Sequence, residues 1–108
     1  MTDATGPQIE VTNNAAARRY EVHVDGELAG LTTYDLVGEQ VVFTHAEVYP
    51  KFEGHGIGSA LARAALDDVI AQEKVITPRC PFIVDYVRRH PSYLEYVDPQ
   101  HRQRISED

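Results

Sequence analysis

The chain has 108 residues, which suffices for one domain but not for two. Its 17 acidic and 10 basic residues give a formal charge of −7, which argues against a nucleic-acid partner because phosphate neutralisation needs clustered Lys and Arg. The charge mildly favours a cationic substrate such as an amine, or it serves solubility alone. One cysteine excludes an intrachain disulfide and favours a cytoplasmic location, and we find neither a signal-peptide pattern nor an apolar run of membrane-spanning length.

The first half of the chain predicts a meander of strands. Residues 1–14 are polar and are expected to form a flexible tail. Strands are expected at residues 19–24, 28–36 and 41–48. Asp25-Gly26 is typical of a two-residue hairpin, and Gly38 lies in the second turn. Because both links are short, these strands should pair antiparallel.

The second half predicts helices that cover this sheet. A helix is expected at residues 59–73, a short strand at 74–77 and a second helix at 82–89, with Pro81 in its first turn. The first helix should turn one apolar arc toward the sheet, formed by Leu61, Ala62, Ala65, Leu66 and Val69. Residues 100–108 are expected to be a flexible tail, which leaves a domain at residues 15–99. The predicted class is α+β, with a mostly antiparallel sheet and helices packed on it.

Three glycines at alternate positions separate the third strand from the long helix. Gly54, Gly56 and Gly58 have no Cβ atoms, so backbone amides can approach a ligand closely, and the helix start adds unpaired donors. The turn therefore predicts a phosphate or diphosphate site, although a tight strand-to-helix turn would also need glycine. No Lys follows as a P-loop requires, and the spacing differs from that of a dinucleotide-binding loop.

This turn resembles the acetyl-CoA loop of the GCN5-related N-acetyltransferase superfamily, whose pattern is Gln/Arg-x-x-Gly-x-Gly/Ala. Residues 53–58 fill that pattern, but Glu53 stands where the family has Gln or Arg, so its carboxylate should turn away from a bound diphosphate. The resemblance implies acetyl-CoA or coenzyme A as the cofactor. The cofactor-binding residues it suggests are Glu47, Val48, Gly54, His55, Gly56, Ile57, Gly58, Ser59, Cys80, Tyr86 and Arg89.

A closer resemblance, over residues 20–97, is to the short YidJ-type or NATD1-like branch of that superfamily. The matching blocks are the glycine turn and residues 43–48, 78–82 and 89–93. The branch lacks the two N-terminal helices that help larger members to form a substrate pocket, and so does this chain. The resemblance implies that His45 and Cys80 are a catalytic pair.

The chemistry of His45 fits that role. Strand alternation predicts that Phe43, His45 and Glu47 share one face. An amine must lose a proton to attack a thioester, histidine is suited to accept it near neutral pH, and Glu47 could orient the ring. The alternative is a half-buried strand histidine that makes a structural hydrogen bond.

Cys80 and Tyr86 each allow a functional and a structural interpretation. Cys80 precedes Pro81 and is expected at the N-cap of the last helix, where the helix dipole would stabilise a thiolate that carries the acetyl group. Alternatively it lines the thiol channel or is a small buried residue of the core. Tyr86 matches a helix in which the superfamily often has a tyrosine that protonates the departing CoA thiolate; core packing is the alternative.

Together these features predict an N-acetyltransferase that transfers an acetyl group from acetyl-CoA to an amine acceptor, which is a peptide, a protein or a small amine. No metal is expected, and a monomer is compatible with the sequence. Two other hypotheses remain open at this point. One is a non-catalytic CoA-binding module, favoured by the missing substrate helices, and the other is a small structural domain without a cofactor.

Overall fold

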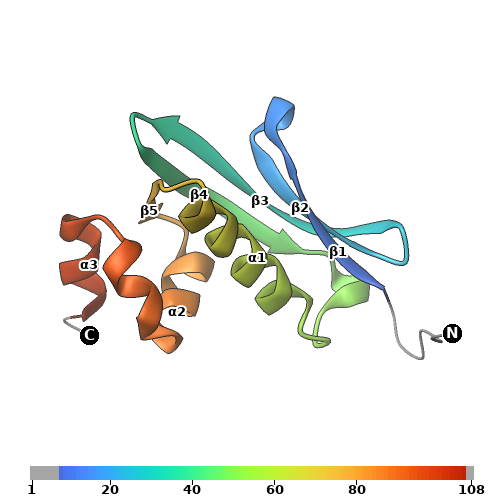
Figure 1. Ribbon diagram of the computed structural model, residues 1–108. Helices are drawn as coiled ribbons and strands as arrows, with labels where there is room; N and C mark the ends of the chain where they lie inside the picture. Colours follow the sequence, from blue (N-terminus) through green and yellow to red (C-terminus); the bar gives the residue numbers. More distant parts are fainter. Residues whose placement is uncertain (1–7, 107–108) are drawn as a thin grey trace, which may run out of the picture.

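A five-stranded sheet with helices packed on it forms the protein, and the computed structural model describes residues 8–106. The spatial order is β1-β2-β3-β4-β5, the order of the strands along the chain. The strands are β1 Ile9–Asn14, β2 Arg19–Val24, β3 Glu27–Val37, β4 Gln40–Val48 and β5 Val75–Pro78. The helices are α1 Ile57–Ala71, α2 Pro81–Arg89 and α3 Pro99–Ser106, with 3-10 turns at Ala15–Ala17, Pro50–Phe52 and Pro91–Tyr96. Helix α1 crosses the sheet, while α2 and α3 lie at its β5 end (Figure 1).

The predicted meander is confirmed, and its turns explain the register. Asp25 and Gly26 both have positive φ, 51° and 87°, as the primed turn of a two-residue hairpin requires. Gly38, with φ of 58°, turns the chain between β3 and β4. The links β1–β2, β2–β3 and β3–β4 are antiparallel, so the mostly antiparallel α+β class is confirmed.

The helix-facing side of the sheet forms the core. All five residues of the predicted apolar arc of α1 are fully buried, each at 0% exposure: Leu61, Ala62, Ala65, Leu66 and Val69. They pack with Phe43, Val22 and Ile76 from three strands of the sheet. Helix α1 begins two residues before the predicted start, because Gly56 with φ of 74° is already its N-cap.

Strand β5 is the one parallel neighbour in the described sheet, and it is short. It pairs with β4 from Gln40↔Val75 to Phe43↔Pro78, and the Arg79 N–H closes this ladder on Phe43 O at 3.0 Å. The chain then turns into α2, whereas β4 continues to Val48. The last part of β4 therefore pairs with β3 and has an open edge on its other side.

Both predicted tails are wrong over most of their length. Residues 9–14 form β1, an edge strand that pairs with β2 from Ile9↔Val24 to Asn14↔Arg19. At the other end, α3 begins at Pro99 with Asp98 as its cap, because the Asp98 carboxylate accepts the His101 N–H at 3.1 Å. The domain therefore exceeds the predicted residues 15–99 at both ends. Residues 1–7 and 107–108, the rest of the two predicted tails, lie outside the described residues.

No helix within residues 8–106 has both the length and the apolar character to cross a bilayer.

Candidate functional site

The open edge of β4 and the start of α1 enclose a groove. Its volume is about 400 Å³. Its lining is contributed by the end of β4, the glycine turn, the first turn of α1 and the start of α2: Ala46, Glu47, Val48, Phe52, Glu53, Gly54, Gly56, Ile57, Gly58, Ser59 and Phe82. We call it the β4–α1 groove.

The start of α1 presents free donors to this groove. Within the described chain, the first helical hydrogen bond of α1 is the one that the Ala60 N–H donates to Gly56 O at 3.1 Å. The amides of Ile57, Gly58 and Ser59 precede it and have no helical acceptor. No acidic residue lies in the first helical turn, so no side-chain carboxylate of that turn competes with an anion for the positive end of the helix dipole.

The three glycines serve two different purposes. Gly54 and Gly56 have φ of +84° and +74°, a conformation that L side chains rarely adopt, and a Cβ on either would meet no atom within 4 Å. Gly58 has a packing reason instead, because a Cβ there would lie 2.8 Å from the Phe82 ring and 3.4 Å from Val48. The turn thus leaves open space above its first two glycines and brings α1 close to Phe82 at the third.

A β-bulge in β4 precedes His45, the predicted catalytic histidine. The register between β3 and β4 shifts between Thr33 and Tyr34, so that Tyr34 opposes Phe43 and Thr33 opposes His45, with Thr44 as the extra residue. The prediction that Phe43, His45 and Glu47 share one face is therefore wrong. Phe43 is fully buried, whereas His45 and Glu47 are exposed.

Beyond the bulge, His45 and Glu47 form a pair on the open face of the sheet. Their Nε2 and Oε1 atoms lie 3.5 Å apart, and their side chains are 60% and 46% exposed. Glu47 lines the β4–α1 groove and His45 does not, so Glu47 connects the histidine to the groove. Ala46 and Val48 alternate with this pair and pack toward the core.

Cys80 is the N-cap of α2, as predicted, but it lies outside the groove lining. The residue is 2% exposed and belongs to the hydrophobic core, and its side chain makes no capping hydrogen bond. The thiol is free. The structure does not bring it to the groove surface, and its part in catalysis stays a prediction.

Tyr86 and Arg89 lie further along α2, away from the groove. Tyr86 is 4% exposed and its ring stacks on His90 with centroids 4.1 Å apart. Burial is the main cause that raises the pKa of its hydroxyl, so the group keeps its proton. Arg89 forms an ion pair with Asp85 at 3.1 Å, one turn earlier on the same helix. Neither residue lines the groove.

Of the predicted cofactor-binding residues, the structure brings seven to one groove: Glu47, Val48, Gly54, Gly56, Ile57, Gly58 and Ser59. His55 is exposed on the turn but does not contribute to the lining. Glu53 does contribute, and the prediction that its carboxylate turns outward stays a prediction. Within residues 8–106, no cluster of three or more His, Cys, Asp and Glu residues could hold a metal ion.

Sequence reasoning missed the aromatic walls of the groove. Phe52 lies in the 3-10 turn after β4, and Phe82 opens α2. The signal for Phe82 was Gly58 itself, since a glycine in a helical turn suggests a close neighbour. Identifying that neighbour required the position of α2, which local sequence does not contain.

The sheet and the groove define a class of fold with known relatives. The solution structure of a GCN5-like protein from Staphylococcus aureus superposes with a TM-score of 0.63, covers 82% of this chain and 86% of that one, and shares 18% sequence identity. At this identity the likeness shows the fold, which is the GCN5-related N-acetyltransferase fold.

Sequence comparison shows the family. The model for the GCN5-related N-acetyl-transferase family matches residues 19–97, more than half of the chain. Protein NATD1 of Gallus gallus and that of Homo sapiens are each 33% identical to the chain over 98 residues; the alignments span 87% of this chain and 89% and 87% of those proteins. The chain belongs to the GCN5-related N-acetyltransferase family.

Proposed function

We propose that the protein binds acetyl-CoA in the β4–α1 groove and transfers the acetyl group to an amine. One observation carries this proposal. The same groove is lined by helical amides without an acceptor, by two glycines with open space at their Cβ positions, and by an unpaired strand edge. Diphosphates bind to unpaired helical amides, and an extended ligand chain can pair with an open strand edge.

The residues of the groove fit the parts of the cofactor. The amides of Ile57, Gly58 and Ser59 would hold the diphosphate. The edge of β4 at Val48 and the rings of Phe52 and Phe82 would line the path of the less polar pantetheine arm. Glu47 and Glu53 also line the groove and oppose anion binding, so the backbone donors must outweigh their repulsion.

When bound, acetyl-CoA would supply an activated thioester. His45 would accept the proton that the acceptor amine loses as its nitrogen bonds to the acetyl carbon, and Glu47 would orient the imidazole through the 3.5 Å contact. The acetyl–sulfur bond would break as the new carbon–nitrogen bond forms, which would release CoA as its thiolate. In the covalent alternative, the Cys80 thiolate would displace CoA from the acetyl group, and the amine would then displace the Cys80 thiolate.

Calorimetry with CoA and turnover of acetyl-CoA with a panel of amines test this proposal. We expect CoA to bind, at least one amine to be acetylated, and His45→Ala to lower turnover without lowering CoA affinity. Absence of CoA binding at millimolar ligand would overturn the proposal. Intact-mass analysis after incubation with acetyl-CoA separates the two routes, because the covalent route leaves an acetyl group on Cys80.

A non-catalytic CoA-binding module is the second candidate, and the positions of the catalytic candidates favour it. Neither His45 nor Cys80 lines the groove, and Cys80 is buried. This candidate predicts that CoA binds, that no amine in a broad panel is acetylated, and that His45→Ala changes nothing measurable.

A further inference from the structure

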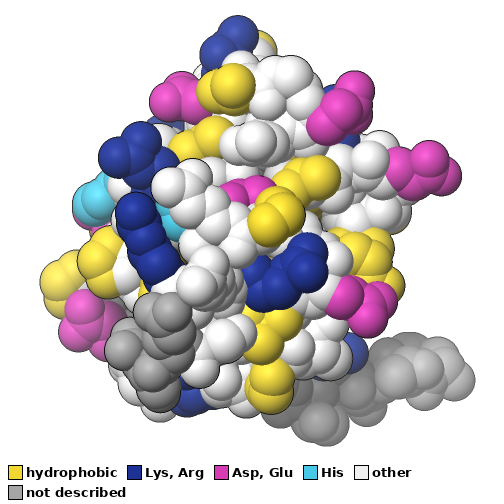
Figure 2. Space-filling view, turned by 90° about the vertical axis from the view of Figure 1, so that its left-hand side faces the viewer, with side chains coloured by type: hydrophobic (Ala, Val, Ile, Leu, Met, Phe, Trp, Pro, Cys, Tyr) yellow, Lys and Arg dark blue, Asp and Glu magenta, His cyan; other side chains and the backbone are white. Residues whose placement is uncertain are grey.

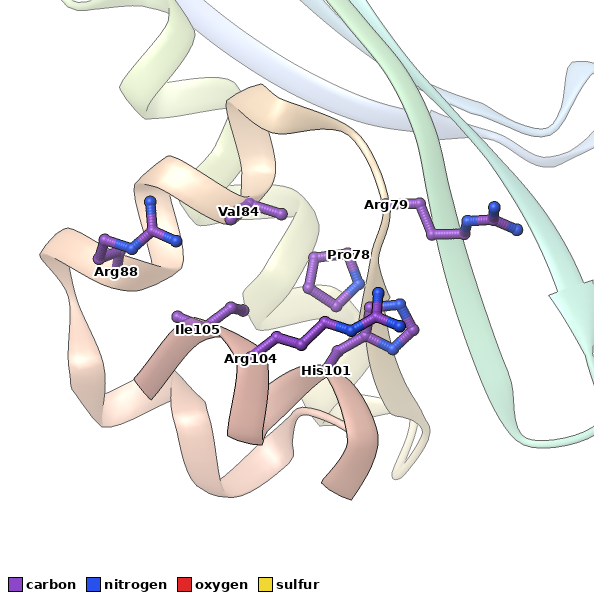
Figure 3. A pocket seen from close by; sticks show the side chains of 7 residues that line it. All are labelled: Pro78, Arg79, Val84, Arg88, His101, Arg104 and Ile105. Carbon is purple, nitrogen blue, oxygen red and sulfur yellow. The ribbon is translucent and has the colours of Figure 1, made fainter. Parts of the chain in front are cut away.

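A second hollow lies on the other side of α2 from the β4–α1 groove. It has a volume of about 320 Å³ and lies between the end of β5, α2 and α3 (Figure 3). The residues that line it are Pro78, Arg79, Val84, Arg88, His101, Arg104 and Ile105. None of them lines the β4–α1 groove.

This hollow continues into a neighbouring one of about 360 Å³ that reaches β4. The two share Arg79, His101 and Arg104, and the second adds Val37, Gln40, Val42, Thr77 and Gln100. We call the pair the arginine groove. Three of the chain's 10 Lys and Arg residues line it, and among residues 8–106 no Asp or Glu does, although the chain carries a formal charge of −7. Figure 2 shows this end of the molecule, with Lys and Arg side chains gathered beside His side chains.

The side chains of the groove combine charge with an apolar floor. Pro78, Val84 and Ile105 lie between Arg88 and Arg104, and the Arg104 guanidinium lies beside the His101 ring (Figure 3). Arg79 extends away from them toward β4. A charged ligand group over an apolar floor is partly shielded from water, which strengthens its attraction to guanidinium groups.

Two of the arginines have unused capacity for an anion. Within residues 8–106, neither Arg79 nor Arg104 forms an ion pair with a carboxylate. Two acids lie near the groove within the described residues. The exposed Asp35 is opposite Val42 on β3, and Asp98 is 7% exposed and lies 3.0 Å from His101 Nδ1. That contact fixes the imidazole and leaves its Nε2 as the nitrogen available to a ligand.

The arginine groove opens on the same face of the sheet as His45. Val42 lines it, while the neighbouring Val41 and Phe43 point into the core. After the bulge, His45 and Glu47 lie on the face opposite the core, which is also the face of Val42. Three strand residues span about 10 Å. A ligand with one group bound near Val42 can therefore place another group, about 10 Å away along its chain, at His45.

We propose that the arginine groove binds the carboxylates of an acidic peptide acceptor and so brings its amine to His45. The inference rests on the proposed acetyltransferase function and names its acceptor class. Guanidinium groups pair carboxylates in a bidentate manner. A long polyanion such as a nucleic acid fits less well, because the acidic residues elsewhere on the surface repel it. The overall negative charge favours a cationic substrate, whereas the local charge of the arginine groove favours an anionic one.

Binding of two matched peptides in the absence of acetyl-CoA tests this inference directly. Each has a free amino terminus, followed in one by three glutamates and in the other by three glutamines. Calorimetry compares the wild type, the double variant Arg79→Gln/Arg104→Gln and the control Arg63→Gln, whose side chain is exposed on α1. We expect the wild type and the control to prefer the acidic peptide by about tenfold and the double variant to lose that preference.

A charge-conserving variant and a CoA titration complete the experiment. Arg79→Lys/Arg104→Lys should keep part of the preference, which separates charge from folding. Equal affinity for both peptides, a preference that survives the double glutamine variant, or tighter binding of an oligonucleotide than of the acidic peptide would overturn the inference. CoA affinity should be the same in every variant, so failure of CoA binding counts against the proposed function and leaves the peptide result to stand by itself.

Discussion

The two halves of β4 differ in what surrounds them. From Val41 to Phe43 the strand pairs with β3 on one side and β5 on the other, and its core-facing side chains are buried. From Thr44 to Val48 it pairs with β3 and its other edge is open. The bulge at Thr44 separates the halves and changes which side chains face the core. One strand therefore contributes to the core at its start and leaves an unpaired edge at its end.

The largest expected effect tests the open half. His45→Ala should lower the turnover of acetyl-CoA with a competent amine by about 100- to 10,000-fold, the usual contribution of a general base. The midpoint of thermal unfolding should change little because the side chain is 60% exposed. Steady-state kinetics and a melting curve measure the two quantities. Unchanged turnover would remove His45 from the mechanism, whereas the absence of turnover with any amine in the wild type would favour the non-catalytic module.

The buried half should respond in the opposite way. Phe43 is fully buried and packs near the rings of Tyr20 and Tyr34, with centroids 6.2 and 6.4 Å away. Phe43→Ala should lower the free energy of unfolding by about 3–5 kcal/mol, measured by urea denaturation. CoA affinity of the folded protein should be retained. If the variant does not fold, Phe43→Leu provides the same comparison at a smaller cost, because it removes fewer buried atoms.

The packing between Gly58 and Phe82 links stability to the groove. A methyl group at Gly58 would lie 2.8 Å from the Phe82 ring, so Gly58→Ala should lower the free energy of unfolding by about 1–3 kcal/mol and weaken CoA binding. Phe82→Leu should restore part of both in the double variant. Urea denaturation and calorimetry are measured for the wild type, the two single variants and the double variant. If the changes in unfolding free energy of the two single variants simply add in the double variant, the contact is contradicted.

The smallest effect lies in α3, outside both halves of β4. Burial acts to raise the pKa of the Asp98 carboxyl, but hydrogen bonds from the side chain and backbone of His101 outweigh it and lower the pKa below its ordinary value. Asp98 therefore stabilises the fold above a pH of about 4, and this stabilisation is lost as the pH falls through the lowered pKa. Asp98→Ala should cost about 1 kcal/mol near neutral pH and less in acid. Urea denaturation across this pH range measures the difference, and a cost that is constant with pH would contradict it.

Local sequence predicted the elements that contain their own signals. Asp25-Gly26 requires positive φ at both positions, and the apolar arc of α1 repeats at helical spacing, so both were found. Strand β1 was missed because Glu10, Thr12 and Asn13 are polar on an exposed edge. Helix α3 was missed although Asp98 and Pro99 are a cap and a first-turn residue that predict a helix start.

The site was predicted in part, for the same reason. The seven groove residues that were predicted lie close together in the chain, at the end of β4 and the start of α1. Phe82 comes from α2, and the arginine groove combines Arg79 with His101 and Arg104 from α3. Strict alternation along β4 also failed, because the extra residue of the bulge depends on the pairing with β3 and not on β4 alone.

Backbone amide chemical shifts during a CoA titration test the central claim most directly. The largest changes should occur at Ile57, Gly58 and Ser59, because their unpaired amides are the proposed partners of the diphosphate. Gly38 is the internal reference, because it also has positive φ and open space around it but lies in the turn between β3 and β4. Shifts confined to other parts of the protein, or none at saturating CoA, would contradict the account.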